Sequence, residues 1–458
     1  MNDLLTTKEM PDRWGVSAKQ NARTKTIGDY CARFDEIEKK YNILYPESNN
    51  ATYTSLLNYS DDLEKPFQRW CRYKEGFSTQ LVQNLIKHYS THTSNIILDP
   101  FSGSGSTILA ANKLGYEGIG FEVNPFSFYL SKCKLCNYTN SEKKEFDAAY
   151  KKLLKDMLIK KRGYTLPALS ISKKVFNKKI EKIMMTLKVL IEESEYTDNI
   201  KNLLKLGWLA SIEPLCNYRK AGNGLKIKKY VKPRIITEDD AVKILQNEYS
   251  VMSADIRDET TKKHSKIYNT SCLNMGSYIK DSSIDGIIFS PPYANCFDYT
   301  EIYKLELWFG GFVKDYSELK KLRKSSLHSH LNGDLKIDVE PKSSLLTELI
   351  NDVQAKDLWD KRIPKMLILY YDDMFTVIDE CYRSLAKGGF CCIVVGNSSY
   401  GGVIFPADLI LADYAERIGF KIDKIVVDRY IITSSQQYEK TKEAGRFQRE
   451  SIVCLVKK

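Results

Sequence analysis

The sequence has no apolar stretch that approaches the roughly 20 residues needed for a membrane-spanning helix. Its first residues also lack the apolar core of a signal peptide. Internal repeats and low-complexity tracts are missing as well, which excludes a repeat architecture. We therefore expect a cytoplasmic protein without a membrane partner.

The sequence also lacks a recognisable cysteine framework. Its 11 cysteines are an odd number and are scattered along the chain, unlike the even set of a disulfide-stabilised scaffold. Cys133 and Cys136 have the spacing of a metal-binding pair, but a structural zinc site needs two further ligands, and no suitable pair follows nearby. We therefore predict ordinary thiols and no metal site.

Positive charge is what this sequence has in excess, and it is concentrated in one segment. The net charge is +11, yet Ser131 to Arg234 holds 25 Lys and Arg against 10 Asp and Glu, an excess of 15 that leaves the rest of the chain at −4. A basic block in an otherwise slightly acidic chain favours a polyanionic partner. The alternative is a solvated, Lys-rich helical face.

Short apolar runs alternate with helical patterns in the remainder of the chain. Residues 95–99 form an apolar run that enters a glycine-rich turn, residues 106–114 have a helical pattern, and residues 115–122 form a second run. This strand–helix–strand unit is typical of an α/β fold with a doubly wound, mostly parallel sheet. The pattern resumes at residues 283–290 and ends with a strand at residues 450–456.

Two acids and two glycines lie where such a sheet binds ligands, at the carboxyl ends of its strands. Gly103 and Gly105 allow the backbone to turn tightly and to approach a ligand closely. Asp99 could accept from a cationic amine, and Glu122 could accept from the hydroxyls of a ribose. A phosphate-binding turn would carry a Lys after its glycines, and this turn has none. The pattern favours a methyl donor made of adenosine and a charged amino acid over a purely structural turn.

The sequence Ser290-Pro-Pro-Tyr293 is the more specific signal. Two prolines after a buried strand remove two backbone donors and leave carbonyl acceptors beside the Ser290 hydroxyl. Such acceptors can bind an amino group and turn its nitrogen lone pair toward an electrophilic methyl group. Tyr293 offers a ring on which a flipped base could stack, and Phe297 and Tyr299 are predicted to complete an aromatic pocket. The alternative is a proline loop that only ends a strand.

Together the two motifs resemble those of the DNA amino-methyltransferases, which act on cytosine-N4 or adenine-N6. The donor motif of that family looks like residues 99–106, and its catalytic tetrad looks like Ser290–Tyr293, with the Ser form typical of the cytosine-N4 branch. Further similarities cover the family's ribose-binding strand, its methionine-side motif and its closing strand, here residues 118–125, 66–78 and 446–453.

The resemblance implies a Rossmann-like fold with a seven-stranded sheet and S-adenosylmethionine as cofactor. The implied donor-binding residues are Asp99, Phe101, Ser102, Gly103, Gly105, Glu122 and Phe77. The implied catalytic residues are Ser290, Pro291, Pro292 and Tyr293, acting on a base flipped out of double-stranded DNA.

A site-specific cytosine-N4 methyltransferase of a restriction-modification or phage-defence system is the favoured hypothesis, with a cognate restriction endonuclease as a candidate partner. Adenine-N6 methylation is an alternative. RNA guanine-N2 methylation is another, although those enzymes usually begin with an RNA-binding module, for which residues 1–60 are short. A non-enzymatic DNA-binding protein with a degenerate methyltransferase fold would have no need of both intact motifs.

The order of the motifs suggests a domain organisation. The tetrad begins 191 residues after Asp99, and the resemblance implies that a target-recognition insertion fills the gap. Arg219 and Lys220, in a loop predicted over residues 217–224, are the expected DNA contacts. The predicted division is an N-terminal arm (1–57), a first catalytic part (58–134), a Lys-rich and mainly helical insertion (135–264), and a second catalytic part (265–458) with an irregular insert at about 313–362.

One segment departs from the family pattern. The family often carries an acid, on the strand before the tetrad strand, that contacts the adenine amino group of the donor. Residues 271–277 are all neutral here, so Asn274 or a backbone carbonyl is the expected substitute.

Overall fold

The computed structural model describes residues 27–46, 60–74, 76, 78–90, 96–229, 236–258, 263–431 and 441–458. Its central feature is an eight-stranded sheet in which only β12 runs antiparallel to its neighbours. The strand order across the sheet is β1 (Ile43–Leu44), β11 (Phe420–Tyr430), β12 (Arg449–Lys457), β8 (Leu385–Gly396), β7 (Ile284–Phe289), β2 (Ile96–Asp99), β3 (Glu117–Phe121) and β6 (Ser265–Tyr268).

The mostly parallel α/β sheet that the sequence predicts is therefore present, but it has one strand more than the expected seven. The additional strand, β1, pairs in parallel with β11 at the edge of the sheet. It is only two residues long, and so short a strand carries no periodic signal in the sequence.

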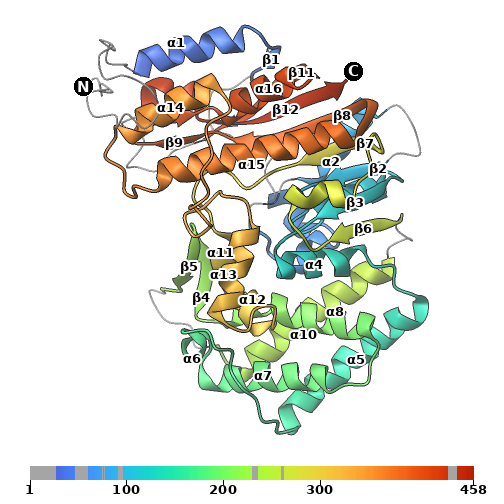
Figure 1. The fold of residues 1–458 in the computed structure, drawn as a ribbon. Coiled ribbons are helices and arrows are strands. Elements are labelled where there is room, and N and C mark those ends of the chain that lie inside the picture. The colour runs from blue at the N-terminus through green and yellow to red at the C-terminus, as the bar shows by residue number, and fades with distance from the viewer. Residues whose placement is uncertain are drawn as a thin grey trace.

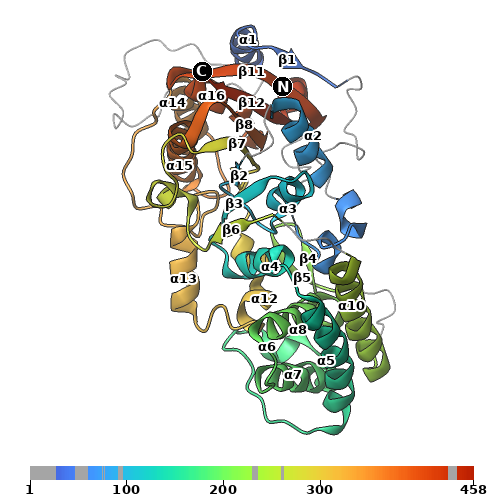
Figure 2. The ribbon, with the colours of Figure 1, turned by 90° about the vertical axis from the view of Figure 1, so that its right-hand side faces the viewer.

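Helices cover both faces of the sheet. In β8, Cys391, Ile393 and Val395 face a core that includes α14 (Ser344–Gln354), α15 (Ile363–Ser384) and α16 (Ala407–Arg417). The intervening residues of β8, Cys392 among them, face α2 (Thr79–Tyr89) and α3 (Ser106–Lys113). Figure 2 shows α14 and α15 on one side of the sheet and α2 on the other. This alternation of buried faces is expected for a sheet that is covered twice.

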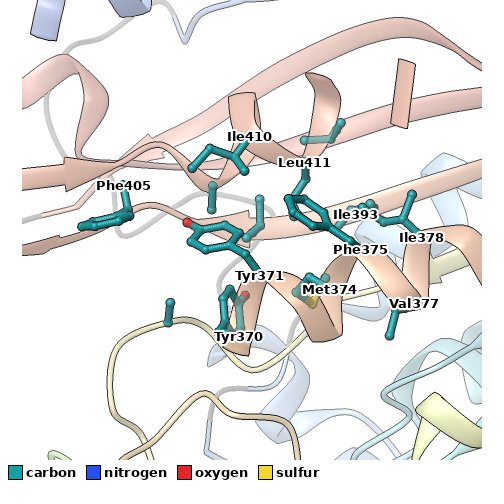
Figure 3. Packing of buried hydrophobic residues seen from close by; sticks show 14 of the residues in the cluster. Tyr370, Tyr371, Met374, Phe375, Val377, Ile378, Ile393, Phe405, Ile410 and Leu411 are labelled. Carbon is teal, nitrogen blue, oxygen red and sulfur yellow. The ribbon is translucent and has the colours of Figure 1, made fainter. Parts of the chain in front are cut away.

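The larger of these two cores is built around α15. Figure 3 shows Tyr371, Met374 and Phe375 of this helix packed toward side chains of the sheet and of α16. The rings of Tyr371 and Phe405 lie 6.5 Å apart. Helix α15 therefore covers one face of the sheet at β8.

Local sequence signals account for the helices of the donor half. Ser78 caps α2 by accepting from the backbone N–H of Gln80 at 3.2 Å. The residue before α3 is Gly105, which takes the left-handed conformation with φ of +80°. A residue with a side chain would be strained there, which explains the glycine.

The chain reverses direction across the sheet at the position that matters for function. From β2 it proceeds through β3 to β6 on one side, and it then returns to β7 on the other side of β2. The carboxyl ends of β2 and β7 therefore flank the switch point of the sheet, where open α/β sheets bind their ligands. Asp99 ends β2, and Ser290 directly follows β7.

The described parts of residues 135–264, which include most of the basic segment, form helices that lie below the sheet in Figure 1 and share a third buried core. They are α5 (Asn140–Ile159), α6 (Ser172–Val175), α7 (Lys178–Glu192), α8 (Asp198–Ala210), α9 (Ile212–Leu215) and α10 (Glu238–Asp258). The expected loop at residues 217–224 is instead part of a β-hairpin, made of β4 (Tyr218–Ala221) and β5 (Gly224–Ile227). Gly222, with φ of +56°, lies in its turn, and hairpin turns favour such a residue.

The insert at residues 313–362 is less irregular than its polar sequence suggests, because it contains two helices. Asp315 caps α13 (Tyr316–Ser325), accepting from the backbone N–H groups of Ser317 and Glu318. Helix α14 is capped by Ser343 and buries an apolar face in the sheet core. Loop residues around these helices obscure their periodicity in the sequence.

The remaining elements are short or lie at the ends of the sheet. They are α1 (Ile27–Glu38), α4 (Pro125–Leu135), α11 (Tyr299–Ile302), α12 (Lys304–Phe309), β9 (Ser398–Tyr400), β10 (Val403–Phe405) and the 3₁₀ turns at Ser60–Glu64, Gln68–Trp70, Cys272–Ser277 and Lys442–Phe447. Within the described part of the chain, none of the helices combines the length and apolarity of a bilayer span.

Candidate active site

A pocket opens where β2, β3 and β7 end. Most of the residues predicted to bind the donor line it, namely Asp99, Phe101, Ser102, Gly103 and Glu122. Gly105 lies beside them as the N-cap of α3, whereas Phe77 lies outside the described residues. The structure therefore brings Asp99, the glycine-rich turn that follows it, and Glu122 of the next strand end together around one cavity.

Hydrogen bonds tie the two acids to the glycine-rich turn. One oxygen of Asp99 accepts from the backbone N–H of Phe101 at 2.9 Å. The carboxylate of Glu122 accepts from the N–H groups of Gly103 and Asn124, at 2.8 and 2.7 Å. Glu122 thus connects the end of β3 to the turn that follows β2.

Burial dominates the electrostatics of both acids. It raises the pKa of Asp99 to about 7 and the pKa of Glu122 to about 7, because each carboxylate loses the solvent that would stabilise its charge. In each case the hydrogen bonds lower the pKa by less than burial raises it. A bound cation or hydroxyl donor would stabilise the charged forms, so the pocket favours a ligand that supplies such groups.

Two further polar groups in the lining fit a polar ligand. Within the part of the chain that the structure describes, the hydroxyl of Ser102 and the side-chain amide nitrogen of Asn124 are buried and make no hydrogen bond. Buried polar groups without partners are costly, and they commonly mark ligand contacts. An acceptor or donor on an adenosine could satisfy each of them, so the residues present fit S-adenosylmethionine.

The neutral segment before β7 contributes to the pocket in a different way from that expected. Thr270, Ser271 and Cys272 belong to the lining, whereas Asn274 does not. The amide of Asn274 donates instead to the Thr270 hydroxyl at 3.2 Å. Asn274 therefore does not line the pocket in place of the missing acid, and a backbone carbonyl of this segment stays the predicted substitute.

The predicted tetrad connects this cavity to a second one. Ser290 lines both cavities, Pro292 lines the first, and Pro291 and Tyr293 line the second. Phe297 and Tyr299, the residues expected to complete a base pocket, also line the second cavity, and their rings lie 4.8 Å apart at 69°. Ser290 therefore lies where the first cavity and the aromatic second cavity meet.

The position of Tyr293 depends on a glycine in β8. A Cβ placed on Gly396 would lie 2.7 Å from an edge carbon of the Tyr293 ring, closer than such atoms approach. The absent side chain lets the ring lie directly against the strand. A larger residue at position 396 would displace the ring from the second cavity.

Several residues in the two cavities were missed by sequence reasoning. In the first, buried Asp298 accepts from the side chains of Thr300 and Asn332, at 2.6 and 2.8 Å. Burial alone would raise its pKa, but His330 and these hydrogen bonds outweigh burial, and the pKa of Asp298 is lowered. Its only signal in the sequence is its place between Phe297 and Tyr299.

Tyr73 also lines the first cavity, and Arg429 and Glu450 line the second. Arg429 and Glu450 come from β11 and β12. Tyr73 and Glu450 lie in the segments that resemble the family's methionine-side motif and closing strand, but their residue types did not single them out, and Arg429 lies in none of the motifs.

The structure separates the two expected DNA contacts. Arg219 is exposed on β4, but its neighbour Lys220 is buried, because successive residues of a strand point to opposite faces. The ammonium of Lys220 lies 2.5 Å from Glu306 and 4.6 Å from the centre of the Tyr303 ring. Burial would lower the pKa of Lys220, but Glu306 outweighs it and the pKa is raised. Lys220 is therefore a structural cation rather than a phosphate contact.

This correction predicts a loss of stability in a Lys220→Met variant. The substitution leaves the carboxylate of Glu306 buried without its cation, and breaking a buried pair in this way typically costs about 3–5 kcal/mol. Urea denaturation would measure the free energy of unfolding. Arg219→Met, on the exposed face of the same strand, is the control and should change it by less than about 0.5 kcal/mol. Equal stability of the two variants would contradict the structural role of Lys220.

Comparisons with known proteins bear on this site. A family model described as DNA methylase matches residues 8–132, and one described as D12 class N6 adenine-specific DNA methyltransferase matches residues 76–206. Both matches include the glycine-rich turn, and neither reaches the tetrad.

Three similar proteins are type II methyltransferases. The type II methyltransferase M.BsoBI of Geobacillus stearothermophilus is 28% identical over 439 residues, which cover 85% of each chain. The other two of these three proteins are also type II methyltransferases. M.AvaI of Nostoc sp. is 28% identical over 81% of this chain and 83% of its own, and M.MvaI of Kocuria varians is 22% identical over 83% and 86%.

These matches support a DNA methyltransferase, and that family implies S-adenosylmethionine as the methyl donor. The mainly parallel sheet is consistent with the fold of such a methyltransferase.

Proposed function

We propose that this chain is a sequence-specific DNA methyltransferase that transfers a methyl group from S-adenosylmethionine to N4 of a flipped cytosine, as part of a restriction-modification or phage-defence system. The observation that carries the proposal is the position of Ser290 at the junction of two cavities. One cavity has the acids and unsatisfied polar groups that suit the donor, and the other has the aromatic walls that suit a base.

The residues of the chain divide the work of such a reaction. S-adenosylmethionine supplies an electrophilic methyl group when it is bound. Asp99 would hold its cationic amine and Glu122 its ribose hydroxyls. The Ser290 hydroxyl and the Pro291 carbonyl would accept the hydrogens of the target amine, so that its nitrogen lone pair faces the methyl group. Tyr293 would hold the base by stacking. The amine can attack first and release its proton to solvent afterwards, so no general base of raised pKa is required.

The basic helical segment would bind the DNA. We propose residues 135–264 as the target-recognition part, with Arg219 as a phosphate contact. In support, β5 of the hairpin packs against α11, whose first residue, Tyr299, lines both cavities. Contacts made by the hairpin would thus lie close to the base.

Adenine-N6 methylation is the second candidate. The match to a model described as adenine-specific favours it, although this match ends at residue 206 and does not include the tetrad. The donor site and the role of Ser290 would be the same for both bases.

The direct test incubates the full chain with unmethylated duplex DNA and S-adenosylmethionine labelled in its methyl group. Nucleosides from the digested DNA are then separated, and transfer to tRNA is measured in parallel. We expect label in N4-methylcytosine, and label in N6-methyladenine would favour the second candidate. Absence of label in DNA, or preferred transfer to tRNA, would contradict the proposal. Modification-sensitive sequencing of the DNA would identify the recognition site.

A further inference from the structure

Residues of three neighbouring strands, β8, β12 and β11, form one wall of the second cavity at one end of these strands. Gly396, near the end of β8, pairs with Glu450 at the start of β12, and Glu450 pairs in turn with Arg429 near the end of β11. Both charged residues line the cavity together with Tyr293. An ion pair therefore lies beside the ring that we propose to stack on the target base.

The two charged side chains contact each other and the aromatic wall. The Nε–H of Arg429 donates to an oxygen of Glu450. A Cβ placed on Gly396 would lie 3.3 Å from Cγ of Glu450 and 2.7 Å from the Tyr293 ring, so the acid and the ring flank the same backbone position. Because the pair uses the Nε side of the guanidinium, its Nη groups retain donors for another ligand.

The backbone before Arg429 is irregular. The pairing of β11 with β12 shifts register between Val427 and Arg429, at Asp428. Bulges of this kind re-aim a side chain and are frequent next to active sites. The ladder between β11 and β12 continues over most of both strands, so backbone pairing holds them together without this ion pair. The bulge and the position in the cavity favour a ligand contact over a purely structural pair.

We infer that Arg429, oriented by Glu450, reads the Watson–Crick edge of the flipped base and selects cytosine. The edge of cytosine beside its N4 amine presents two acceptors, N3 and O2, which match the paired N–H groups of a guanidinium. The edge of adenine beside its N6 amine presents one acceptor, N1, followed by a C–H group. This inference rests on the proposed function and assigns its base specificity to residues of β11 and β12.

The test compares Arg429→Lys with the wild type on a duplex that contains the recognition site found by sequencing. Lysine keeps the charge but cannot donate in the paired geometry, so kcat/KM should fall about tenfold or more. The dissociation constant of S-adenosylhomocysteine should stay unchanged, because Arg429 does not line the donor cavity. Arg383→Lys is the matched control, since Arg383 also pairs with a glutamate, Glu380, but lines neither cavity.

A base analogue separates reading of the base from a structural role. With 3-deazacytosine at the target position, which lacks the N3 acceptor, the wild type should lose about tenfold in kcat/KM, and Arg429→Lys should lose much less. Equal losses in the two proteins would overturn the inference. So would an Arg429→Lys variant as active as the wild type.

A second variant and the identity of the methylated base complete the test. Glu450→Gln weakens the ion pair that orients Arg429 and leaves the guanidinium itself unchanged. It should therefore also lower kcat/KM, and it should reduce the loss in kcat/KM that 3-deazacytosine causes. If Arg429→Lys fails to fold in a thermal melt, this second variant decides the outcome in the same way. Methylated adenine as the product would overturn the inference while leaving a DNA methyltransferase in place. Absence of any transfer to DNA would overturn the proposed function itself.

Discussion

Replacing Ser290 with alanine is expected to lower kcat for methyl transfer by about 10²- to 10³-fold, the usual cost of losing one preorganised polar contact to a reacting group. The hydroxyl follows β7 directly and lies at the junction of the two cavities, so it is placed to accept a hydrogen of the target amine. Without it, the nitrogen lone pair is less well directed at the methyl group. Single-turnover measurement with saturating DNA would report the rate of transfer.

The Ser290→Ala variant should still bind S-adenosylhomocysteine with a dissociation constant within about twofold of the wild-type value, because the acids proposed to hold the donor are unchanged. Ser325→Ala, an exposed serine in the last turn of α13, is the matched control and should transfer methyl groups at the wild-type rate. A Ser290→Ala variant with full kcat would remove the tetrad serine from the mechanism. A variant that loses donor binding and transfer together would assign Ser290 to the donor cavity alone.

Replacing Glu122 with alanine is expected to weaken S-adenosylhomocysteine binding by about 100-fold or more. The proposal gives this carboxylate two hydrogen bonds to a ribose, and bonds to a charged group contribute about 1.5–3 kcal/mol each. The substitution also removes the acceptor of the Gly103 N–H, which fixes the glycine-rich turn in the wild type. Titration calorimetry measures the affinity. Glu117→Ala, at the exposed start of the same strand, should leave it unchanged.

The same site predicts a dependence of donor binding on pH. Burial raises the pKa of Asp99 and of Glu122 to about 7, so below that pH each acid carries a proton that it must lose to accept hydrogen bonds as a carboxylate. Affinity for S-adenosylhomocysteine should therefore fall between pH 8 and pH 6, by up to about tenfold per pH unit for each acid. Glu122→Gln removes one of the two titrations and should give a shallower slope. An equal slope in both proteins would show that Glu122 does not titrate on donor binding.

The sequence predicted much of the fold because its strands and helices carry local signals. The apolar run before Asp99 and the glycines after it predict a strand that enters a tight turn, and β2 and α3 lie there. Signals were weak where elements are short or set in polar surroundings. This explains why β1 was not expected and why the insert around α13 and α14 was predicted to be irregular.

The candidate site was predictable in its parts rather than in its arrangement. Local residue types single out Asp99, Glu122 and Ser290, because the acids, glycines and paired prolines lie at the ends of predicted strands, where such sheets bind ligands. The prediction for Lys220 was wrong because the local sequence does not show which face of the hairpin packs against the protein. Strand alternation placed its neighbour Arg219 on the exposed face instead.

The sequence by itself determined the order of the strands along the chain and the chemical character of the two motifs, since both depend on residues close together in the chain. Only the tertiary structure decided which side chains share a cavity. The two cavities meet at Ser290 because β2 and β7 are neighbours at the switch point of the sheet. Gly396, Glu450 and Arg429 lie side by side because of the register of β8, β12 and β11. The register of strands that are far apart in the sequence depends on which of their faces become buried against each other in the folded protein, so one strand's residues alone do not show it.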